Sequence, residues 1–300
     1  MQEQLHTSII NQLSVKKHIL VTGANGQLGN EFKVLSTKFD NYEYTFVSRE
    51  ELSIDDFNAV ENFFTQNKFD YCINCAAYTA VDKAESEPEL AFNINAAAVE
   101  NLAFLSKKHD VRFIHISTDY VFDGNNEKGY SEDDNTGPLN IYGSTKLAGE
   151  QKALAVNPDT IIIRTSWVYS SFGKNFVKTM MRLMSEKNEI SVVNDQTGSP
   201  TYAADLAEVV FNIITNNESP VPGIYHYSNK GIINWYDFAM EIKKLGNYNC
   251  VIHPIASSAY PTPATRPKYS ILHTEKIKNT FGIEIPDWKD SLKKCFSLLQ

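Results

Sequence analysis

Short apolar runs alternate with helical patterns through the first half of the chain. Runs typical of buried strands cover residues 18–23, 43–48, 71–76, 112–118 and 160–169. The stretches between them, residues 27–39, 53–67, 87–109 and 140–155, repeat apolar residues at the spacing of a helix. Strands and helices in this alternation predict a parallel sheet with right-handed crossovers and helices on both faces.

The pattern loosens after residue 170. We expect helices over residues 174–187, 202–216 and 234–245, with short strands between them, and a loop over 260–269 because that stretch holds three prolines. The fold class is therefore α/β: a Rossmann-type, doubly wound parallel sheet followed by a smaller C-terminal lobe.

Composition and charge limit the classes of binding partner that the protein can have. The 300 residues are 42% hydrophobic and carry a net charge of −8, from 28 Lys and Arg against 36 Asp and Glu. No basic run appears, so we expect no nucleic-acid partner. A small anionic ligand remains compatible, because helix N-termini bind phosphate through backbone N–H groups whatever the net charge.

Cysteines and the N-terminus favour a cytoplasmic protein that does not bind membranes. Cys72 and Cys75 form a C-x-x-C in an apolar run, where their spacing sends the two side chains to opposite faces of a strand. We interpret them as buried small residues rather than a metal or redox pair. Residues 1–16 read as an N-terminal extension without the apolar region of a signal peptide, and no stretch reaches membrane-spanning length.

A glycine-rich turn follows the first strand. Gly23, Gly26 and Gly29 stand directly before a helical stretch. Glycine allows the tight turn, the approach of backbone N–H groups to a pyrophosphate, and close packing of helix on sheet. A plain strand-to-helix turn is the alternative, but the context of strand and helix predicts dinucleotide binding.

The end of the second strand bears on which dinucleotide binds. Ser48 and Arg49 are followed by Glu50 and Glu51. A basic side chain here suits the 2′-phosphate of NADPH, whereas a carboxylate suits the ribose hydroxyl of NADH. Arg49 favours NADPH, and the glutamates keep NADH open.

A group of residues suited to proton transfer follows the fourth strand. Tyr142 and Lys146 are four residues apart, on one face of a predicted helix. A nearby ammonium lowers the pKa of a tyrosine and can also bind the nicotinamide ribose. Ser117 and Thr118 end the fourth strand, at the sheet edge where such folds bind ligands. A hydroxyl there can polarise a carbonyl while the tyrosine supplies the proton.

With these motifs in this order, the chain resembles the extended short-chain dehydrogenase/reductase superfamily. Within it, the resemblance is closest to the branch that reduces the 4-keto group of dTDP-4-dehydro-β-L-rhamnose to dTDP-L-rhamnose, for cell-surface polysaccharide. It spans about residues 17–300. The segments that carry it are GANGQLG (23–29), NCAAYTAVDKAESE (74–87), HISTDYVFDG (115–124), PLNIYGSTKLAGE (138–150), RTSWVY (164–169), NFVKTM (175–180), VNDQTGSPT (193–201) and YPTPATRP (260–267).

The resemblance implies a role for each matching position. It implies an NAD(P)-binding domain over residues 17–170, to which later segments return, and a mainly substrate-binding lobe over 171–300. Tyr142 would donate the proton, with Lys146 and Thr118 assisting. Beside Arg49 and the three glycines, the implied cofactor positions are Gln27, Leu28, Glu51, Leu52, Ala76, Ala77, Tyr78, Tyr142 and Lys146. The implied positions for the nucleotide sugar are Thr79, Val81, Thr118, Asp119, Tyr120, Trp167 and Arg266.

Related families set the alternatives. Sugar-nucleotide dehydratases of this superfamily carry Asp-Glu after the threonine, whereas Asp119 is followed by Tyr120, which favours reduction. Some reductases of this kind hold a metal at a dimer contact. Glu31 fits that pattern but Asp205 and Glu208 do not match it clearly, so we expect a homodimer without a required metal. Two other interpretations remain open. The chain could be a partner protein like the regulatory subunit of methionine adenosyltransferase, or it could be a nucleotide-sugar epimerase.

Overall fold

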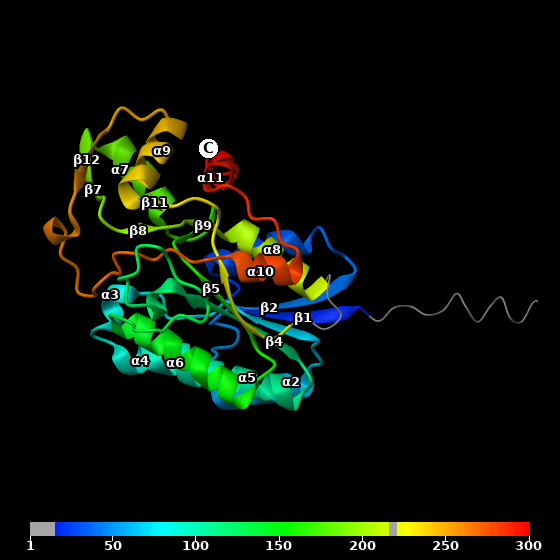
Figure 1. The fold of residues 1–300 in the computed structure, drawn as a ribbon. Coiled ribbons are helices and arrows are strands. Elements are labelled where there is room, and N and C mark those ends of the chain that lie inside the picture. Colours follow the sequence, from blue (N-terminus) through cyan, green and yellow to red (C-terminus); the bar gives the residue numbers. More distant parts are fainter. Residues whose placement is uncertain (1–15, 216–220) are drawn as a thin grey trace, which may run out of the picture.

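A six-stranded parallel sheet forms the centre of the computed structural model, which describes residues 16–215 and 221–300 (Figure 1). The strand order is β10-β5-β4-β3-β1-β2, with every neighbouring pair parallel. The strands are β1 Lys17–Thr22, β2 Tyr42–Val47, β3 Tyr71–Asn74, β4 Arg112–Thr118, β5 Ile161–Thr165 and β10 Gly223–Tyr227. The predicted α/β fold with a doubly wound parallel sheet is confirmed. The expected N-terminal extension lies, apart from its last residue, outside the described residues.

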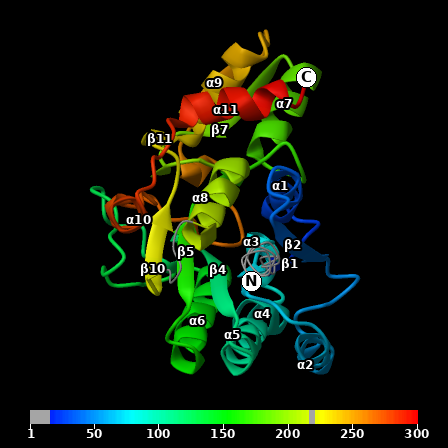
Figure 2. The same cartoon turned by 90° about the vertical axis from the view of Figure 1, so that its right-hand side faces the viewer.

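Helices cover both faces of the sheet, as Figure 2 shows. Side chains alternate along β1: Ile19 and Val21 pack with the core on one face, and Leu20 packs with the core on the other. The first face is covered by α1 Gln27–Ser36, α8 Ala203–Thr215 and α10 Glu275–Phe281. The second face is covered by α2 Phe57–Gln66, α5 Ala98–Lys108 and α6 Ile141–Val156.

The long helix expected over residues 87–109 is interrupted. It divides into α4 Pro88–Phe92, a π-helical turn Asn93–Ala97, and α5, with the short helix α3 Val81–Ala84 before it. One extra residue in a helical turn changes the direction in which side chains point, and such turns are frequent at functional sites. Hydrophobic periodicity does not reveal the interruption, because the apolar stripe continues across it.

The C-terminal lobe has its own apolar core, built on aromatic and sulfur side chains of Phe238, Trp288 and Met180. Its helices are α7 Phe176–Glu186, α9 Trp235–Leu245 and α11 Trp288–Ser297. Its short strands are β6 Val168–Tyr169, β7 Glu189–Val193, β8 Thr197–Gly198, β9 Thr201–Tyr202, β11 Ile233–Asn234 and β12 Val251–Ile255. The sequence pattern predicted α7, α8 and α9 to within two residues, although residue 216 of the expected second helix lies outside the described residues. It missed α10 and α11.

Two segments from the second half of the chain belong to the central layer. The strand β10 pairs with β5 and extends the sheet by one strand, and α8 packs against α1. The chain therefore crosses between sheet and lobe more than once, and the two parts face each other across the carboxyl ends of the strands.

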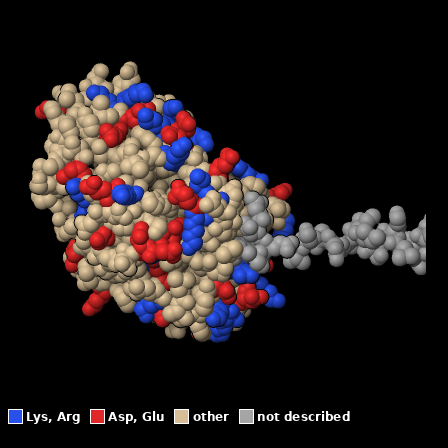
Figure 3. All heavy atoms as spheres, viewed as in Figure 1, with Lys and Arg blue, Asp and Glu red and all other residues tan. Residues whose placement is uncertain are grey.

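The two cysteines of the C-x-x-C lie on opposite faces of the sheet, as their spacing predicts, but only Cys72 is buried, whereas Cys75 is half-buried. Cys72 packs with the core on one face of the sheet and Cys75 against the core on the other, and both are free thiols. On the face drawn in Figure 3, described Lys and Arg side chains lie interspersed with Asp and Glu. None of the helices described has the length and apolarity that crossing a bilayer requires.

Candidate active site

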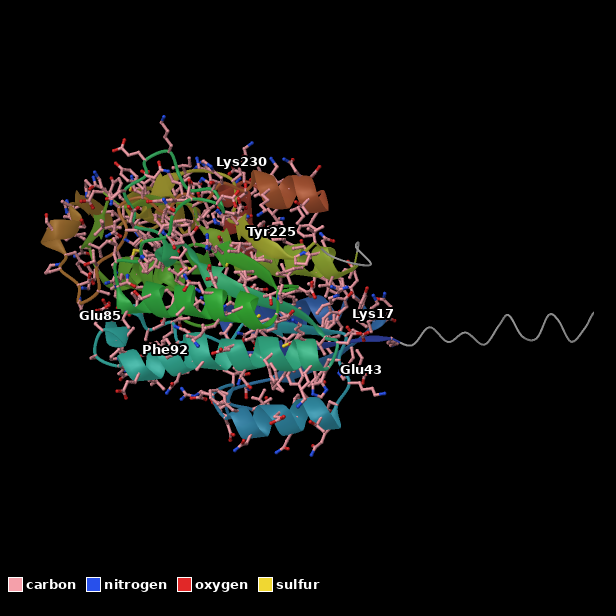
Figure 4. The ribbon with its side chains drawn as sticks, turned by 60° about the horizontal axis from the view of Figure 1, so that its bottom comes forward. Lys17, Glu43, Glu85, Phe92, Tyr225 and Lys230 are labelled. Atoms are coloured by element: carbon pink, nitrogen blue, oxygen red, sulfur yellow. The ribbon has the colours of Figure 1, made fainter. Side chains whose placement is uncertain are left out.

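A cavity of about 830 Å³ opens at the carboxyl ends of the strands, between sheet and lobe. Figure 4 shows the two ends of the sheet layer: Lys17 stands where β1 begins, and Glu85, next to the start of α6, stands at the opposite end. Most of the residues expected at the site line this cavity. They are Gly23, Gly26, Gln27, Leu28, Arg49, Leu52, Ala76, Ala77, Tyr78, Thr79, Val81, Thr118, Asp119, Tyr120, Tyr142, Lys146 and Trp167.

The glycine turn lets the start of α1 pack closely against the residues that follow β3. Gly23 has φ of +67°, and a Cβ there would lie 2.6 Å from the backbone nitrogen of Ala76. Gly29 does not line the cavity; a Cβ at this position would collide with the carbonyl of Gly23, so glycine here permits close packing. The helix α1 begins at Gln27 without a side-chain cap, so its first N–H groups face the cavity unpaired by a capping side chain. This cradle fits a pyrophosphate.

A loop from the second half of the chain contacts this turn. The Gln27 amide oxygen accepts a hydrogen bond from Asn175 Nδ2 at 2.9 Å, and a Cβ at Gly173 would lie 3.0 Å from Gln27 Cγ. The contact carries Lys174 to the cavity wall, close to the phosphate cradle. Sequence reasoning missed Lys174, because a single lysine so far along the chain from the turn carries no signal of its own.

Of the residues that follow β2, some line the cavity and others turn away from it. Arg49 and Glu50 line the cavity, whereas the Glu51 carboxylate turns back and accepts the Ser48 N–H at 2.8 Å. That backbone hydrogen bond holds the pKa of Glu51 below its usual range. Glu51 does not line the cavity and instead stabilises the loop that presents Arg49.

The residues after β3 are held by an asparagine from the π-helical turn. Asn95 accepts the N–H of Tyr78 at 2.8 Å and donates to its carbonyl at 3.1 Å. Asn95 also donates to Thr145 on α6 at 3.2 Å. The interruption of the helix therefore fixes the loop 76–79 against the helix that carries Tyr142. Sequence reasoning missed Asn95 because it missed the interruption.

Tyr142, Thr118 and Asp119 meet at the floor of the cavity. Thr118 Oγ1 donates to Asp119 Oδ1 at 2.9 Å and accepts the Tyr120 N–H at 3.2 Å. Burial raises the pKa of Tyr142 to about 12, against the opposing effect of its hydrogen bond with Thr118. Tyr142 thus keeps its proton at neutral pH.

Lys146 lies deeper than expected. It is 1% exposed, and its Nζ donates to the Ile116 carbonyl at 2.7 Å and lies 3.1 Å from His115 Nε2. Burial lowers the pKa of Lys146 to about 8, although Glu150 acts in the opposite direction. In this arrangement burial of the phenol, which raises the pKa of Tyr142, outweighs the effects that lower it.

Asp119 presents a free oxygen atom. The residue is buried, which raises its pKa to about 7 even though Thr118 and Ser270 stabilise its charge. Its Oδ2 is buried and has no hydrogen-bond partner among the described residues. Because a buried acceptor without a partner is costly, this atom suits a ligand that brings a donor such as a sugar hydroxyl.

Trp167 breaks the strand expected over residues 160–169. Its backbone is left-handed, with φ of +47°, so β5 ends at Thr165 and β6 begins at Val168. Its indole stacks on Trp235 with ring centroids 3.7 Å apart, and both rings line the cavity. Trp235 comes from α9 in the lobe and was missed, since a tryptophan at the start of a helix is ordinary core material.

Arg266 does not line the cavity. Its guanidinium binds Asp82 with two hydrogen bonds, one of them 2.7 Å long between Nη2 and Oδ2, and Asp82 also accepts the Ala264 N–H. The pair ties the proline-rich loop to α3. Its charge is balanced by Asp82, so the structure gives Arg266 a partner other than a diphosphate.

The carboxylates considered for a metal have protein partners. Glu31 accepts from Ser170 at 2.6 Å, and Asp205 accepts from Asn229 at 2.7 Å. Glu208 lies 4.0 Å from Lys38. Across residues 16–215 and 221–300, the side chains of His, Cys, Asp and Glu form no cluster of three or more that could hold a metal ion.

Comparison with known proteins agrees with this geometry. A family model, the RmlD substrate binding domain, matches residues 17–300. The chain is 40% identical over 285 residues to a dTDP-4-dehydrorhamnose reductase of Aggregatibacter actinomycetemcomitans, covering 92% of this chain and 97% of the relative. A crystal structure of a dTDP-4-dehydrorhamnose reductase from Clostridium acetobutylicum superposes with a TM-score of 0.90 at 43% identity, over 94% of this chain and 99% of the other. A structure of a dTDP-4-dehydrorhamnose reductase from Bacillus anthracis, solved in complex with NADP, superposes with a TM-score of 0.90 at 39% identity. The superposition covers 94% of this chain and 99% of the other. The chain therefore belongs to the RmlD family, the family of the dTDP-4-dehydrorhamnose reductases.

Proposed function

We propose that this chain reduces the 4-keto group of dTDP-4-dehydro-β-L-rhamnose to the hydroxyl of dTDP-L-rhamnose, with NADPH as reductant. The observation that carries the proposal is the meeting of Tyr142, Thr118 and Asp119 at the floor of one cavity, beside the glycine cradle. Its relatives, named for this reaction, support the assignment of the sugar.

The residues present fit the cofactor. The backbone around Gly26 and the uncapped start of α1 would hold the pyrophosphate, and Lys174 supplies a positive charge near it. Arg49, exposed at the cavity edge, would bind the 2′-phosphate, with the competing carboxylate of Glu51 turned away. When bound, NADPH supplies the hydride that reduces C4. The NADP bound to the Bacillus anthracis relative supports this choice over NADH.

Tyr142, Thr118 and Lys146 would handle the proton. Tyr142 holds a proton at neutral pH and would donate it to the oxygen at C4 as negative charge develops there. Thr118 lies beside it and would hydrogen-bond the same oxygen. Lys146, one helical turn away, would stabilise the phenolate that remains.

The sugar would lie between the floor and the aromatic wall. Asp119 Oδ2 offers an unpaired acceptor for a sugar hydroxyl, and the indole of Trp167 offers an apolar face. Thr79, Val81 and Tyr120 line the same cavity. Arg266 would act indirectly, by holding the loop over α3 through Asp82.

A spectrophotometric assay of NADPH oxidation with dTDP-4-dehydro-β-L-rhamnose tests the proposal, run beside other 4-keto nucleotide sugars and repeated with NADH. We expect turnover that is fastest with the rhamnose precursor and NADPH. An epimerase would interconvert two sugars without net oxidation of NADPH, and a regulatory subunit would oxidise none while copurifying with a partner. Either result would overturn the proposal.

We further propose a cytoplasmic homodimer as the working form. Light scattering coupled to gel filtration tests the assembly, with a mass of one chain as the contrary result.

A further inference from the structure

A line of buried polar side chains runs behind the active site. It passes from Thr22 on β1 through Asn74 on β3 and His115 on β4 to Lys146 on α6, and these residues are at most 1% exposed. Apart from Lys146, they do not line the cavity. Buried polar networks are costly unless each member is satisfied, so the donor and acceptor at each contact can be followed along the line.

The orientation of Asn74 is set by a backbone group. Asn74 Oδ1 accepts the N–H of Ala76 at 3.2 Å and the hydroxyl of Thr22 at 2.6 Å. A backbone N–H can only donate, so the carboxamide oxygen must face Ala76. The amide nitrogen of Asn74, which also only donates, therefore points at His115.

This orientation selects one tautomer of His115. The distance from Asn74 Nδ2 to His115 Nδ1 is 3.0 Å. Burial, and to a smaller extent Lys146, hold the pKa of His115 well below its usual value, so the ring is neutral. Nδ1 accepts from Asn74, and the single ring proton of a neutral histidine must then be on Nε2.

The protonated Nε2 faces Lys146. The two nitrogens are 3.1 Å apart, while Lys146 Nζ also donates to the Ile116 carbonyl at 2.7 Å. An ammonium has three donors and no acceptor, so it cannot accept from Nε2–H. The contact becomes a hydrogen bond only when Lys146 is a neutral amine.

The other titratable groups around Lys146 do not prevent the contact with His115 from favouring the neutral amine. Glu150, one turn along α6, favours the charged lysine but is itself bound by Arg164. Burial raises the pKa of the Cys75 thiol, which therefore stays neutral, and the Tyr142 phenol is likewise protonated at neutral pH.

We propose that His115 is a positioning residue: held in its Nε2–H form by Asn74, it favours the neutral amine of Lys146 and so sets the pH at which this lysine changes charge. The consequence for catalysis rests on the proposed function. Only the ammonium form of Lys146 can stabilise the Tyr142 phenolate by its charge, so the pH at which this lysine changes charge limits the reduction on the basic side.

NMR of protein labelled with ¹⁵N-histidine tests the tautomer directly and needs no activity. With His115 assigned by its loss in His115→Gln, we expect the signal of an unprotonated nitrogen for Nδ1 and of a protonated nitrogen for Nε2. A proton on Nδ1 would overturn the proposal. If His115→Gln does not fold, His115 is assigned by elimination from variants of the other described histidines.

Asn74→Asp tests the coupling to Lys146. An aspartate still accepts from Ala76 and Thr22, but it also accepts from His115 and so moves the ring proton to Nδ1. The titration of Lys146, followed by ¹³C-lysine NMR, should then shift to higher pH by about one unit, a tenfold change in proton affinity. The basic limb of the kcat/KM profile should move with it.

The matched control is His226→Gln, at a second fully buried histidine that contacts Arg164 rather than Lys146. It should leave the titration of Lys146 in place. An unshifted Lys146 in folded Asn74→Asp would contradict the inference while leaving the proposed reduction intact. If the wild-type protein has the expected His115 tautomer but does not reduce the sugar, the inference about His115 stands and the proposed function is contradicted.

Discussion

The indole rings of Trp167 and Trp235 lie face to face, with centroids 3.7 Å apart and planes within 11° of parallel. Trp167 follows the end of β5 in a left-handed backbone conformation that is rare outside glycine, whereas Trp235 begins α9 of the lobe. The contact therefore joins the two parts of the molecule at the wall of the cavity. A backbone conformation of this cost persists where its surroundings hold it in place.

We predict that Trp235→Ala weakens binding of the nucleotide sugar. Loss of the stack leaves the Trp167 indole free to move, and an aromatic pair contributes about 0.5–1.5 kcal/mol, so KM for the sugar should rise by roughly two- to tenfold. Steady-state kinetics measures this, with KM for NADPH as an internal reference. Trp235→Phe, which keeps a ring at the position, should restore most of the loss. Equal KM values for all three proteins would refute the role.

Tyr142→Phe should remove the proton donor with little change in shape. Proton transfer by a positioned side chain contributes about 10²–10⁴-fold, so kcat should fall by that factor while NADPH still binds. Stopped-flow turnover and NADPH fluorescence titration separate the two effects. Tyr260→Phe, at an exposed tyrosine outside the cavity, is the control and should keep full activity. Undiminished turnover in Tyr142→Phe would exclude this tyrosine as the donor.

Asp119 should make the protein less stable as pH rises. Its pKa is raised to about 7 in the folded protein, so its folded state binds a proton that the unfolded chain releases near pH 4. Its contribution to stability is complete below about pH 4 and is lost as pH rises through about 7. Asp119→Asn should abolish this loss. Between pH 4 and pH 8, its free energy of unfolding should therefore rise by about 2–4 kcal/mol relative to that of the wild type.

Urea denaturation of both proteins across this pH range measures the effect. Asp159→Asn, at an exposed position, should follow the wild-type curve. Parallel curves for wild type and Asp119→Asn would show that the carboxyl group is not strained by burial.

Arg49→Ala should change the choice of cofactor. A hydrogen bond to a charged group contributes about 1.5–3 kcal/mol, so loss of the guanidinium should raise KM for NADPH by roughly 10- to 100-fold and leave KM for NADH nearly unchanged. Kinetics with each cofactor at saturating sugar checks this. Arg182→Ala, on the exposed surface of α7, serves as control. A parallel rise for NADPH and NADH would instead indicate a structural role for Arg49.

Local sequence was enough for those features that depend on neighbouring residues. Short continuous apolar runs predicted β1 to β5 of the sheet, because helices cover both of its faces and neighbouring residues such as Ile19 and Leu20 pack into different cores. The order of glycine turn, Ser-Thr strand end and Tyr-x-x-x-Lys predicted where the cavity lies, since parallel strands bring their carboxyl ends to one edge. Asp119, too, was expected at the site, because its segment resembles the reductase family.

Contacts between distant segments lay beyond that reasoning. Lys174 reaches the glycine turn through the contact of its loop with Gln27, and Trp235 reaches Trp167 from another part of the lobe. Arg266 was expected among the positions for the nucleotide sugar, and in the structure its guanidinium pairs with Asp82, which is far away in sequence. None of these contacts can be predicted from the local sequence pattern around either of the two residues that it joins.

The sequence by itself thus determined the fold class, the position of the cavity and the types of side chain available for proton transfer, because each follows from local periodicity and strand order. Only the tertiary structure decided the charge states of those side chains. The pKa of Tyr142, Lys146 and Asp119 depends on burial and on partners brought from other strands and helices, and the desolvation of a charge has no counterpart in a linear pattern.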